Sequence, residues 1–281
     1  MEVDVGGAAP SPPSRRRALF LMGAAALGLT GLAADDVRPG DRSPAPTEPT
    51  VRARPVIKPT PTPTPTPTPR PASWTPGQLT ASETPVRYLT TLAPPPPPKS
   101  IALTIDDGPH PEWTPRVLDL LAEENVRATF FIIGEQVKEY PALTRRIADA
   151  GHQICNHTET HPIDIADLST KRVRQEIVDA HDRIADTTGI VPRFFRSPGG
   201  AWSDTVLELT AEHGMLPIDW AVDPRDWARP GTGSIRRGLL ECDDGDILLC
   251  HDGGGDRSQT VAALESVIPK LKKRGLTFVT L

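Results

Sequence analysis

His157 and His161 are the first pair in this sequence whose types and spacing could do chemistry together. Three intervening residues place both imidazoles on one side of a helical turn or tight loop, where they could share an ion. Such a pair alone is more often incidental than a ligand set. A carboxylate from the acidic pair Asp106 and Asp107 would complete a three-ligand site with an open position for water or substrate.

The acidic pair itself favours a nearby cation. Two adjacent ionised carboxylates repel one another unless positive charge lies close by. The simplest division of labour makes one of them a metal ligand and the other a base. Gly108 and Pro109 follow directly and shape a turn at this point, which is compatible with a site.

These residues stand at the ends of predicted strands. Strand-like runs lie at 101–105, 128–133, 153–155, 193–195, 216–219, 246–250 and 277–281. Helical patterns separate most of them, for example at 114–124, 142–150, 171–186, 204–212 and 261–273. Such alternation favours an α/β fold, a distorted (β/α) barrel of about seven parallel strands, although a doubly wound sheet remains an alternative.

Polar residues follow five of the strands, where barrel enzymes build their active sites. The five segments are Asp106-Asp107-Gly108-Pro109, residues 157–161, 196–200 and 223–227, and His251-Asp252-Gly253. In this order they resemble the five motifs of the polysaccharide deacetylases, which are carbohydrate esterase family four with its NodB-homology domain. The resemblance covers residues 100–281. It implies a distorted β/α barrel, a divalent metal that is usually zinc, and hydrolysis of acetyl groups on sugars.

The resemblance also implies roles for the residues around the metal. Asp107, His157 and His161 are expected to bind the ion, and Asp106 to act as general base. Arg196 is expected to orient Asp106.

Further roles are carried over in the same way. The Gly199 N–H is expected to hold the oxyanion, and His251 to protonate the leaving amine. Asp223 and Asp226 are expected to hold Arg196 and His251 in place. Substrate contacts are expected from Pro198, Gly200, Trp227 and Leu249, with the Trp227 ring forming a wall of the pocket.

Two positions depart from the family pattern. Ile105 stands where the family usually has Phe, which is a conservative packing change. Gly199 stands where an aromatic residue, often Tyr, is usual. The backbone N–H survives in glycine, but the missing side chain widens the groove, and Trp202 is a candidate to compensate for it.

The N-terminal third of the sequence differs in composition from the rest of the chain. Residues 1–34 contain Arg15-Arg16-Arg17 followed by an apolar run, which predicts a signal peptide, with a twin-arginine variant and an uncleaved membrane anchor both open. Residues 35–98 carry Thr-Pro alternation and a run of five prolines, which predict a disordered, extended linker. We expect a tether that holds a 99–281 catalytic domain outside the membrane or in the cell wall; a ligand for proline-binding modules is the alternative.

Composition limits the partners. A net charge of -5 and a pI near 5.8 provide no basic surface for nucleic acid. The 3 cysteines cannot all pair within one chain. Cys155 and Cys250 are expected to be buried thiols, whereas a disulfide at Cys242 stays open.

The expected substrate follows from the tether. A domain held near its own wall meets peptidoglycan N-acetylglucosamine first; chitooligosaccharides and acetylxylan are alternatives. An inactive wall-carbohydrate-binding module is the alternative of another class, but such a copy commonly loses the base or a ligand. A different metal hydrolase, such as an amidase, would share the two histidines but not Arg196 and the Asp226-Trp227 pair.

Overall fold

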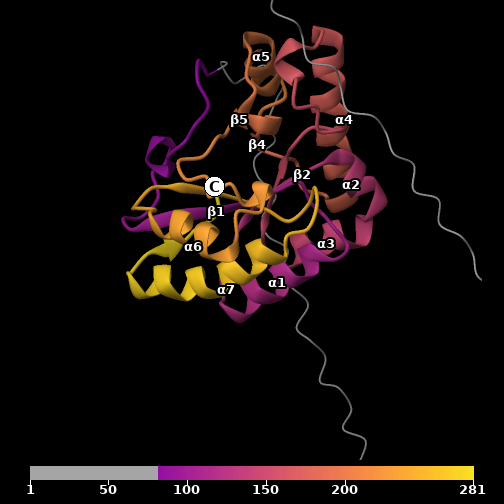
Figure 1. The fold of residues 1–281 in the computed structure, drawn as a ribbon. Helices are drawn as coiled ribbons and strands as arrows, with labels where there is room; N and C mark the ends of the chain where they lie inside the picture. The colour runs from indigo at the N-terminus through magenta and orange to yellow at the C-terminus, as the bar shows by residue number, and fades with distance from the viewer. Residues whose placement is uncertain (1–81) are drawn as a thin grey trace, which may run out of the picture. The chain divides into compact units, whose positions relative to one another are not determined.

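The computed structural model describes residues 82–281 (Figure 1). The predicted export segment at 1–34 and the predicted linker at 35–81 lie outside the described residues, so both stay predictions. Within the described residues, no helix combines the length and apolar character needed to cross a bilayer.

A curled sheet of parallel strands organises this part of the chain. The strands are β1 (Ser100–Asp106), β2 (Thr129–Ile132), β3 (Gln153–Asn156), β4 (Phe194–Phe195), β5 (Leu216–Pro217), β6 (Ile247–His251) and β7 (Thr277–Phe278). They lie in the order β5-β4-β3-β2-β1-β6, and β7 pairs with the start of β1. The edge strands β5 and β6 form no ladder with each other, but the segment after β5 reaches β6 through a bridge from Val222 to Leu248. The predicted distorted barrel of parallel strands is confirmed.

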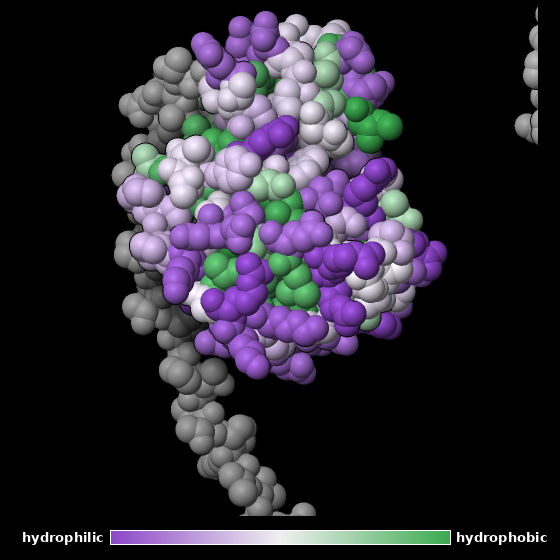
Figure 2. All heavy atoms as spheres, turned by 60° about the vertical axis from the view of Figure 1, so that its left-hand side comes forward, coloured by the Kyte–Doolittle hydropathy of each residue, from purple (hydrophilic) through white to green (hydrophobic). Residues whose placement is uncertain are grey.

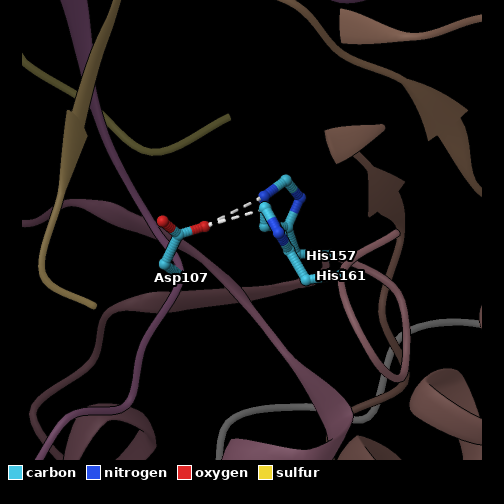
Figure 3. Close-up of side chains that lie close together, drawn as sticks. All are labelled: Asp107, His157 and His161. Carbon is cyan, nitrogen blue, oxygen red and sulfur yellow. Dashed lines mark ion pairs between the residues drawn. The ribbon is translucent and has the colours of Figure 1, made fainter. Parts of the chain in front are cut away.

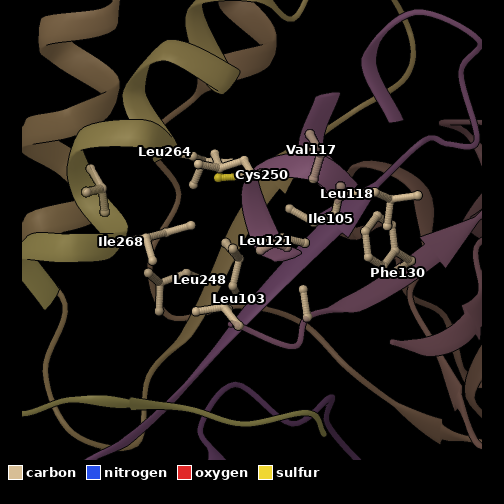
Figure 4. Packing of buried hydrophobic residues seen from close by; sticks show 14 of the residues in the cluster. Leu103, Ile105, Val117, Leu118, Leu121, Phe130, Leu248, Cys250, Leu264 and Ile268 are labelled. Carbon is tan, nitrogen blue, oxygen red and sulfur yellow. The ribbon is translucent and has the colours of Figure 1, made fainter. Parts of the chain in front are cut away.

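Side chains alternate between the two faces of the strands. On β1 and β6, the outward-facing Leu103, Ile105, Leu248 and Cys250 pack with helical residues in the main core (Figure 4). The helical residues labelled there are Val117, Leu118 and Leu121 of α1 (Trp113–Glu123) and Leu264 and Ile268 of α7 (Ser258–Lys273). Full burial of such an aliphatic side chain contributes roughly 1.5–3 kcal/mol. The opposite face of the same strands carries the polar residues.

Helices cover the outer face. Besides α1 and α7 they are α2 (Gly134–Glu139), α3 (Pro141–Asp149), α4 (Thr170–Thr188), α5 (Asp204–Glu212) and α6 (Thr232–Leu240). Helix α4 starts where Ser169 accepts a hydrogen bond from the Arg172 N–H and ends at Gly189 in the left-handed conformation. Helices α2 and α6 were not among the predicted ones; α2 has only six residues, too few to show a periodic pattern.

The linker prediction is wrong at its C-terminal end, because residues 86–92 belong to the folded domain. Val86 forms a parallel bridge with Ile218, and Tyr88 an antiparallel bridge with Asp246. The short helix η1 (Leu89–Thr91) buries Leu89, which is 1% exposed. This short apolar run lies between prolines, so the composition of the stretch as a whole predicted a linker.

All three cysteines are buried free thiols, as predicted for Cys155 and Cys250, and Cys242 forms no disulfide. Stability therefore rests on the apolar core.

On the face shown in Figure 2, hydrophilic side chains surround a small hydrophobic patch.

Candidate active site

Asp107, His157 and His161 form a compact group at the carboxyl ends of β1 and β3, as predicted. The Asp107 Oδ1 atom lies 3.4 Å from His157 Nε2 and 3.2 Å from His161 Nε2. One ligand atom from each residue lies within 4.8 Å of the others. In Figure 3 the carboxylate faces both imidazoles across a small gap. This arrangement suits one shared cation.

Three residues around the group adopt left-handed backbone conformations. The φ angles are 74° at Asp107, 70° at Thr158 and 60° at His161. Such values are uncommon for non-glycine residues and gather at functional sites, where the surrounding structure enforces them. The segment 157–161 is a loop and not a helical turn.

The polar atoms of the group fit a divalent metal. Asp107 Oδ1 is buried and has no hydrogen-bond partner among the described residues. His157 Nδ1 lies 2.8 Å from the Arg196 carbonyl oxygen, so that nitrogen carries the proton and donates it. The lone pair of a neutral His157 is then on Nε2, which faces Asp107. A cation between these atoms would satisfy both of them.

Electrostatics keep Asp107 ionised. Burial by itself would raise the pKa of Asp107, but the imidazoles of His157 and His161 lower it well below its usual value. Burial likewise opposes charge on His161, yet Asp107 raises the pKa of that imidazole. Asp107 is therefore ionised at the point where a cation would bind.

Asp106 is held by Arg196, as predicted. The guanidinium of Arg196 is fully buried; its Nη1 donates to Asp106 Oδ1 at 2.7 Å and to Thr104 Oγ1 at 2.8 Å. The other carboxylate oxygen, Oδ2, lies 3.7 Å from His157 Nε2. Nη2 of Arg196 donates to the Asp219 carbonyl oxygen at 2.9 Å. Asp106 is thus fixed beside the metal group with one oxygen directed toward it.

His251 is paired with Asp226, also as predicted. Its Nδ1 lies 2.7 Å from Asp226 Oδ1, and its backbone N–H donates to Asp226 Oδ2 at 2.9 Å. Thr260 of α7 donates to the same Oδ2 at 2.8 Å. Burial alone would lower the pKa of His251, but Asp226 raises it to about 9. The imidazole is consequently protonated near neutral pH and can act as an acid.

Asp223 does not make the contact predicted for it. Its Oδ1 accepts the Arg225 N–H at 2.7 Å, which stabilises its own loop. No hydrogen bond or ion pair joins it to Arg196 or His251 in the described structure. Asp226 alone holds His251, while backbone carbonyls hold Arg196.

The predicted substrate residues are not equally accessible. Trp227 is 47% exposed, and the Arg225 guanidinium lies 5.1 Å from the centre of its ring. Leu249 is only 3% exposed; it pairs with Thr104 on the inner face of the sheet, below His251. Trp227 can therefore contact a sugar, whereas Leu249 supports the residues above it.

The Pro198–Gly200 turn lies open at the site. Pro198 is buried, whereas Gly199 is exposed with a φ of 61°. A side chain added at Gly199 would meet nothing within 4 Å, so the space for the family's aromatic residue is empty here. A side chain at Gly200 would instead touch Trp220 at 3.3 Å. The Trp202 ring packs edge-on against Phe195, and its Nε1 donates to Asp219 Oδ1.

Two supporting residues, Glu176 and Asp252, were given no role from the sequence. Glu176 of α4 accepts hydrogen bonds from the Thr160 N–H and hydroxyl, both at 2.7 Å, and so fixes the histidine loop. Asp252 is buried beneath Gly108, and its Oδ2 accepts a hydrogen bond from Thr114 at 2.6 Å. Asp252 could have been recognised from its position directly after His251. Glu176 could not, because it lies within an ordinary helical pattern.

Comparisons with known proteins agree with this geometry. The sequence model of the polysaccharide deacetylase family matches residues 93–218. A peptidoglycan-N-acetylglucosamine deacetylase of Bacillus cereus is 44% identical over 185 residues, which are 65% of this chain and 86% of that protein. A chitooligosaccharide deacetylase of Sinorhizobium fredii is 44% identical over 189 residues, 63% of this chain and 87% of that one.

Solved structures show the same fold. One is a peptidoglycan N-acetylglucosamine deacetylase with a TM-score of 0.63 and 36% identity, covering 65% of this chain and 86% of that one. Another is a family-four carbohydrate esterase pseudoenzyme from Bacillus anthracis, with a TM-score of 0.61 and 32% identity, covering 65% and 64% of the two chains. The chain belongs to the polysaccharide deacetylase family, carbohydrate esterase family four. The enzyme class predicted from the motifs, a polysaccharide deacetylase, is confirmed.

Proposed function

We propose that this chain removes N-acetyl groups from N-acetylglucosamine in peptidoglycan. The observation that carries the proposal is the joint placement of three metal-ligating side chains, a buried base held by arginine, and a protonated histidine held by aspartate. All the groups needed for amide hydrolysis are present. The relative from Bacillus cereus, named for this activity, supports peptidoglycan as the substrate.

The metal requirement follows from the ligand set. A divalent cation held by Asp107, His157 and His161 would supply a Lewis acid that polarises the acetyl carbonyl and acidifies a water. Two imidazoles and one carboxylate are a ligand set typical of catalytic zinc, so we propose zinc.

The protein groups divide the proton transfers. Asp106 takes a proton from the attacking water while the water oxygen forms a bond to the acetyl carbon. The Gly199 N–H, on an exposed turn, donates to the developing oxyanion. His251 gives its proton to the amine nitrogen as the carbon–nitrogen bond breaks. Acetate and a glucosamine unit are the products.

Arg196 and Asp226 prepare the two proton-transfer groups. Arg196 orients the Asp106 carboxylate through the 2.7 Å contact, and Asp226 keeps His251 charged and directed into the site. A side chain at Gly199 would meet nothing within 4 Å, so this side of the site is open to a large substrate. The arginine-rich segment and proline-rich tether before residue 82 support export and retention near the wall.

Chitooligosaccharide deacetylation is the second candidate, supported by the relative from Sinorhizobium fredii. An inactive wall-binding module is disfavoured because Asp106, all three ligands and His251 are retained.

A substrate panel tests the proposal. Full-length, zinc-loaded chain is incubated with peptidoglycan, chitooligosaccharide and acetylxylan, and released acetate is measured. We expect the highest kcat/KM on peptidoglycan. A higher value on chitooligosaccharide would favour the second candidate, and no acetate from any of the three would overturn the enzymatic proposal.

A further inference from the structure

Residues 86–89 span the open side of the barrel, between β5 and β6. The Val86 N–H donates to the Pro217 carbonyl at 2.8 Å, and the Val86 carbonyl accepts the Asp219 N–H at 2.7 Å. At the other end, the Leu89 N–H donates to the Gly245 carbonyl at 2.7 Å, just before β6. This segment lies outside residues 93–218, which the family model matches. Through these contacts, residues 86–89 form a strap across the gap between the two edges.

The strap carries a charge to a buried carboxylate. Arg87 Nη2 lies 3.3 Å from Asp219 Oδ2, and the Asp219 side chain is only 4% exposed. Asp219 Oδ1 accepts a hydrogen bond from Trp202 Nε1 at 3.0 Å. Both carboxylate oxygens are thus occupied by donors from the strap and from the segment after the Pro198–Gly200 turn. Loss of the Arg87 donor would leave a buried oxygen of Asp219 without its protein partner, which is unfavourable.

Asp219 lies next to both halves of the site. Its backbone carbonyl accepts from Arg196 Nη2 at 2.9 Å, and Arg196 holds the base Asp106. Its Oδ1 atom would lie 3.8 Å from a Cβ placed on Gly200, beside the expected oxyanion donor Gly199. One residue thereby connects the strap to the base and to the oxyanion turn.

We propose that Asp219 is a positioning residue for the deacetylation reaction and that Arg87 of the strap holds it in place. The inference rests on the proposed function. Displacement of Asp219 moves the carbonyl that holds Arg196 and removes the acceptor of the Trp202 Nε1–H. The substrate does not have to touch Asp219, so its loss impairs turnover more than binding.

The test uses full-length, zinc-loaded chain with the substrate on which the wild type is most active. Arg87→Ala and Asp219→Asn are compared with Arg87→Lys, which keeps a donor and a charge. Arg174→Ala is the matched control, because Arg174 also pairs with a carboxylate, Glu212, at 2.8 Å, but on the surface between α4 and α5. Melting temperature, kcat and KM are measured for each variant.

We expect kcat to fall about tenfold in Arg87→Ala and Asp219→Asn with KM within about twofold of wild type, as small misplacements of catalytic groups produce. Arg87→Lys should recover at least half of the wild-type kcat, and Arg174→Ala should match wild type. If Asp219→Asn does not fold, the exposed Arg87 still decides the question.

A wild-type kcat in Arg87→Ala, a loss confined to KM, or an equal loss in Arg174→Ala would overturn the inference and leave the proposed function standing. An inactive wild type would overturn both.

Discussion

Asp106 and Asp107 are neighbours of the same type, but their side chains have different surroundings. Asp106 meets the guanidinium of Arg196, whereas Asp107 meets the imidazoles of His157 and His161. A base has to stay free of the metal, and a ligand has to face it. These different contacts support the proposed division, with Asp106 as the base and Asp107 as the ligand.

Asp106→Asn should separate the two tasks. The variant keeps the shape of the side chain but cannot take a proton, so we expect kcat to fall by about 10²–10⁴-fold. Zinc affinity, measured by competition with a chelating dye, should stay within a few-fold of wild type. Asp107→Asn is the control, in which affinity for zinc should drop. A loss of zinc from Asp106→Asn would reverse the assignment.

Asp226→Asn should change the pH dependence of the reaction. Asp226 raises the pKa of His251 to about 9, and His251 has to be protonated to act as an acid. Removal of the negative charge lowers that pKa, so the proton is lost at lower pH. We expect the alkaline limb of the kcat profile to move down by about 1–3 units. If the alkaline limb of the kcat profile does not move, then the group that titrates there is not His251.

At the scale of elements, each motif is positioned by a helix or strand that is distant in sequence. The histidine loop is a clear case: Glu176 of α4 is fully buried, accepts two hydrogen bonds from Thr160, and pairs with Arg172 at 2.6 Å. Helix α4 therefore fixes the backbone between the two metal ligands.

Glu176→Gln should weaken metal binding without touching a ligand. The amide replaces one acceptor with a donor opposite Thr160, so the loop that carries His157 and His161 relaxes. We expect zinc affinity to fall by about 10–100-fold, the usual effect of disturbing a ligand's support. Glu212→Gln, in an exposed ion pair, is the control and should bind zinc like wild type. Equal affinities in all three proteins would contradict a supporting role for α4.

Sequence reasoning predicted the strands and the ligand set but not these supports. Asp106, His157, Arg196 and His251 were predictable because strand ends in a barrel converge on one rim. Glu176 and Thr260 were not, since each looks like an ordinary residue of an amphipathic helix and gains its role only from a tertiary contact. The role predicted for Asp223 was wrong because motif spacing does not tell which of two acidic residues turns inward.

At the scale of the whole molecule, the described residues form one barrel whose two edges are joined by the strap at 86–89 and a bridge at Val222. The boundary predicted at residue 99 would have removed Leu89 from the core and Arg87 from Asp219. Composition alone placed this segment in the linker, because a short apolar run between prolines has no recognisable period. The structural role of this segment comes from the gap between β5 and β6 that it crosses, and the sequence does not show that gap.

The central claim is that the group formed by Asp107, His157 and His161 makes acetate release metal-dependent. Acetate released from peptidoglycan by the full-length chain, measured after chelation and again after zinc is restored, tests it most directly. We expect chelation to abolish release and one equivalent of zinc per chain to restore it. Release that persists in metal-free protein, or zinc-loaded protein that releases no acetate, would contradict it.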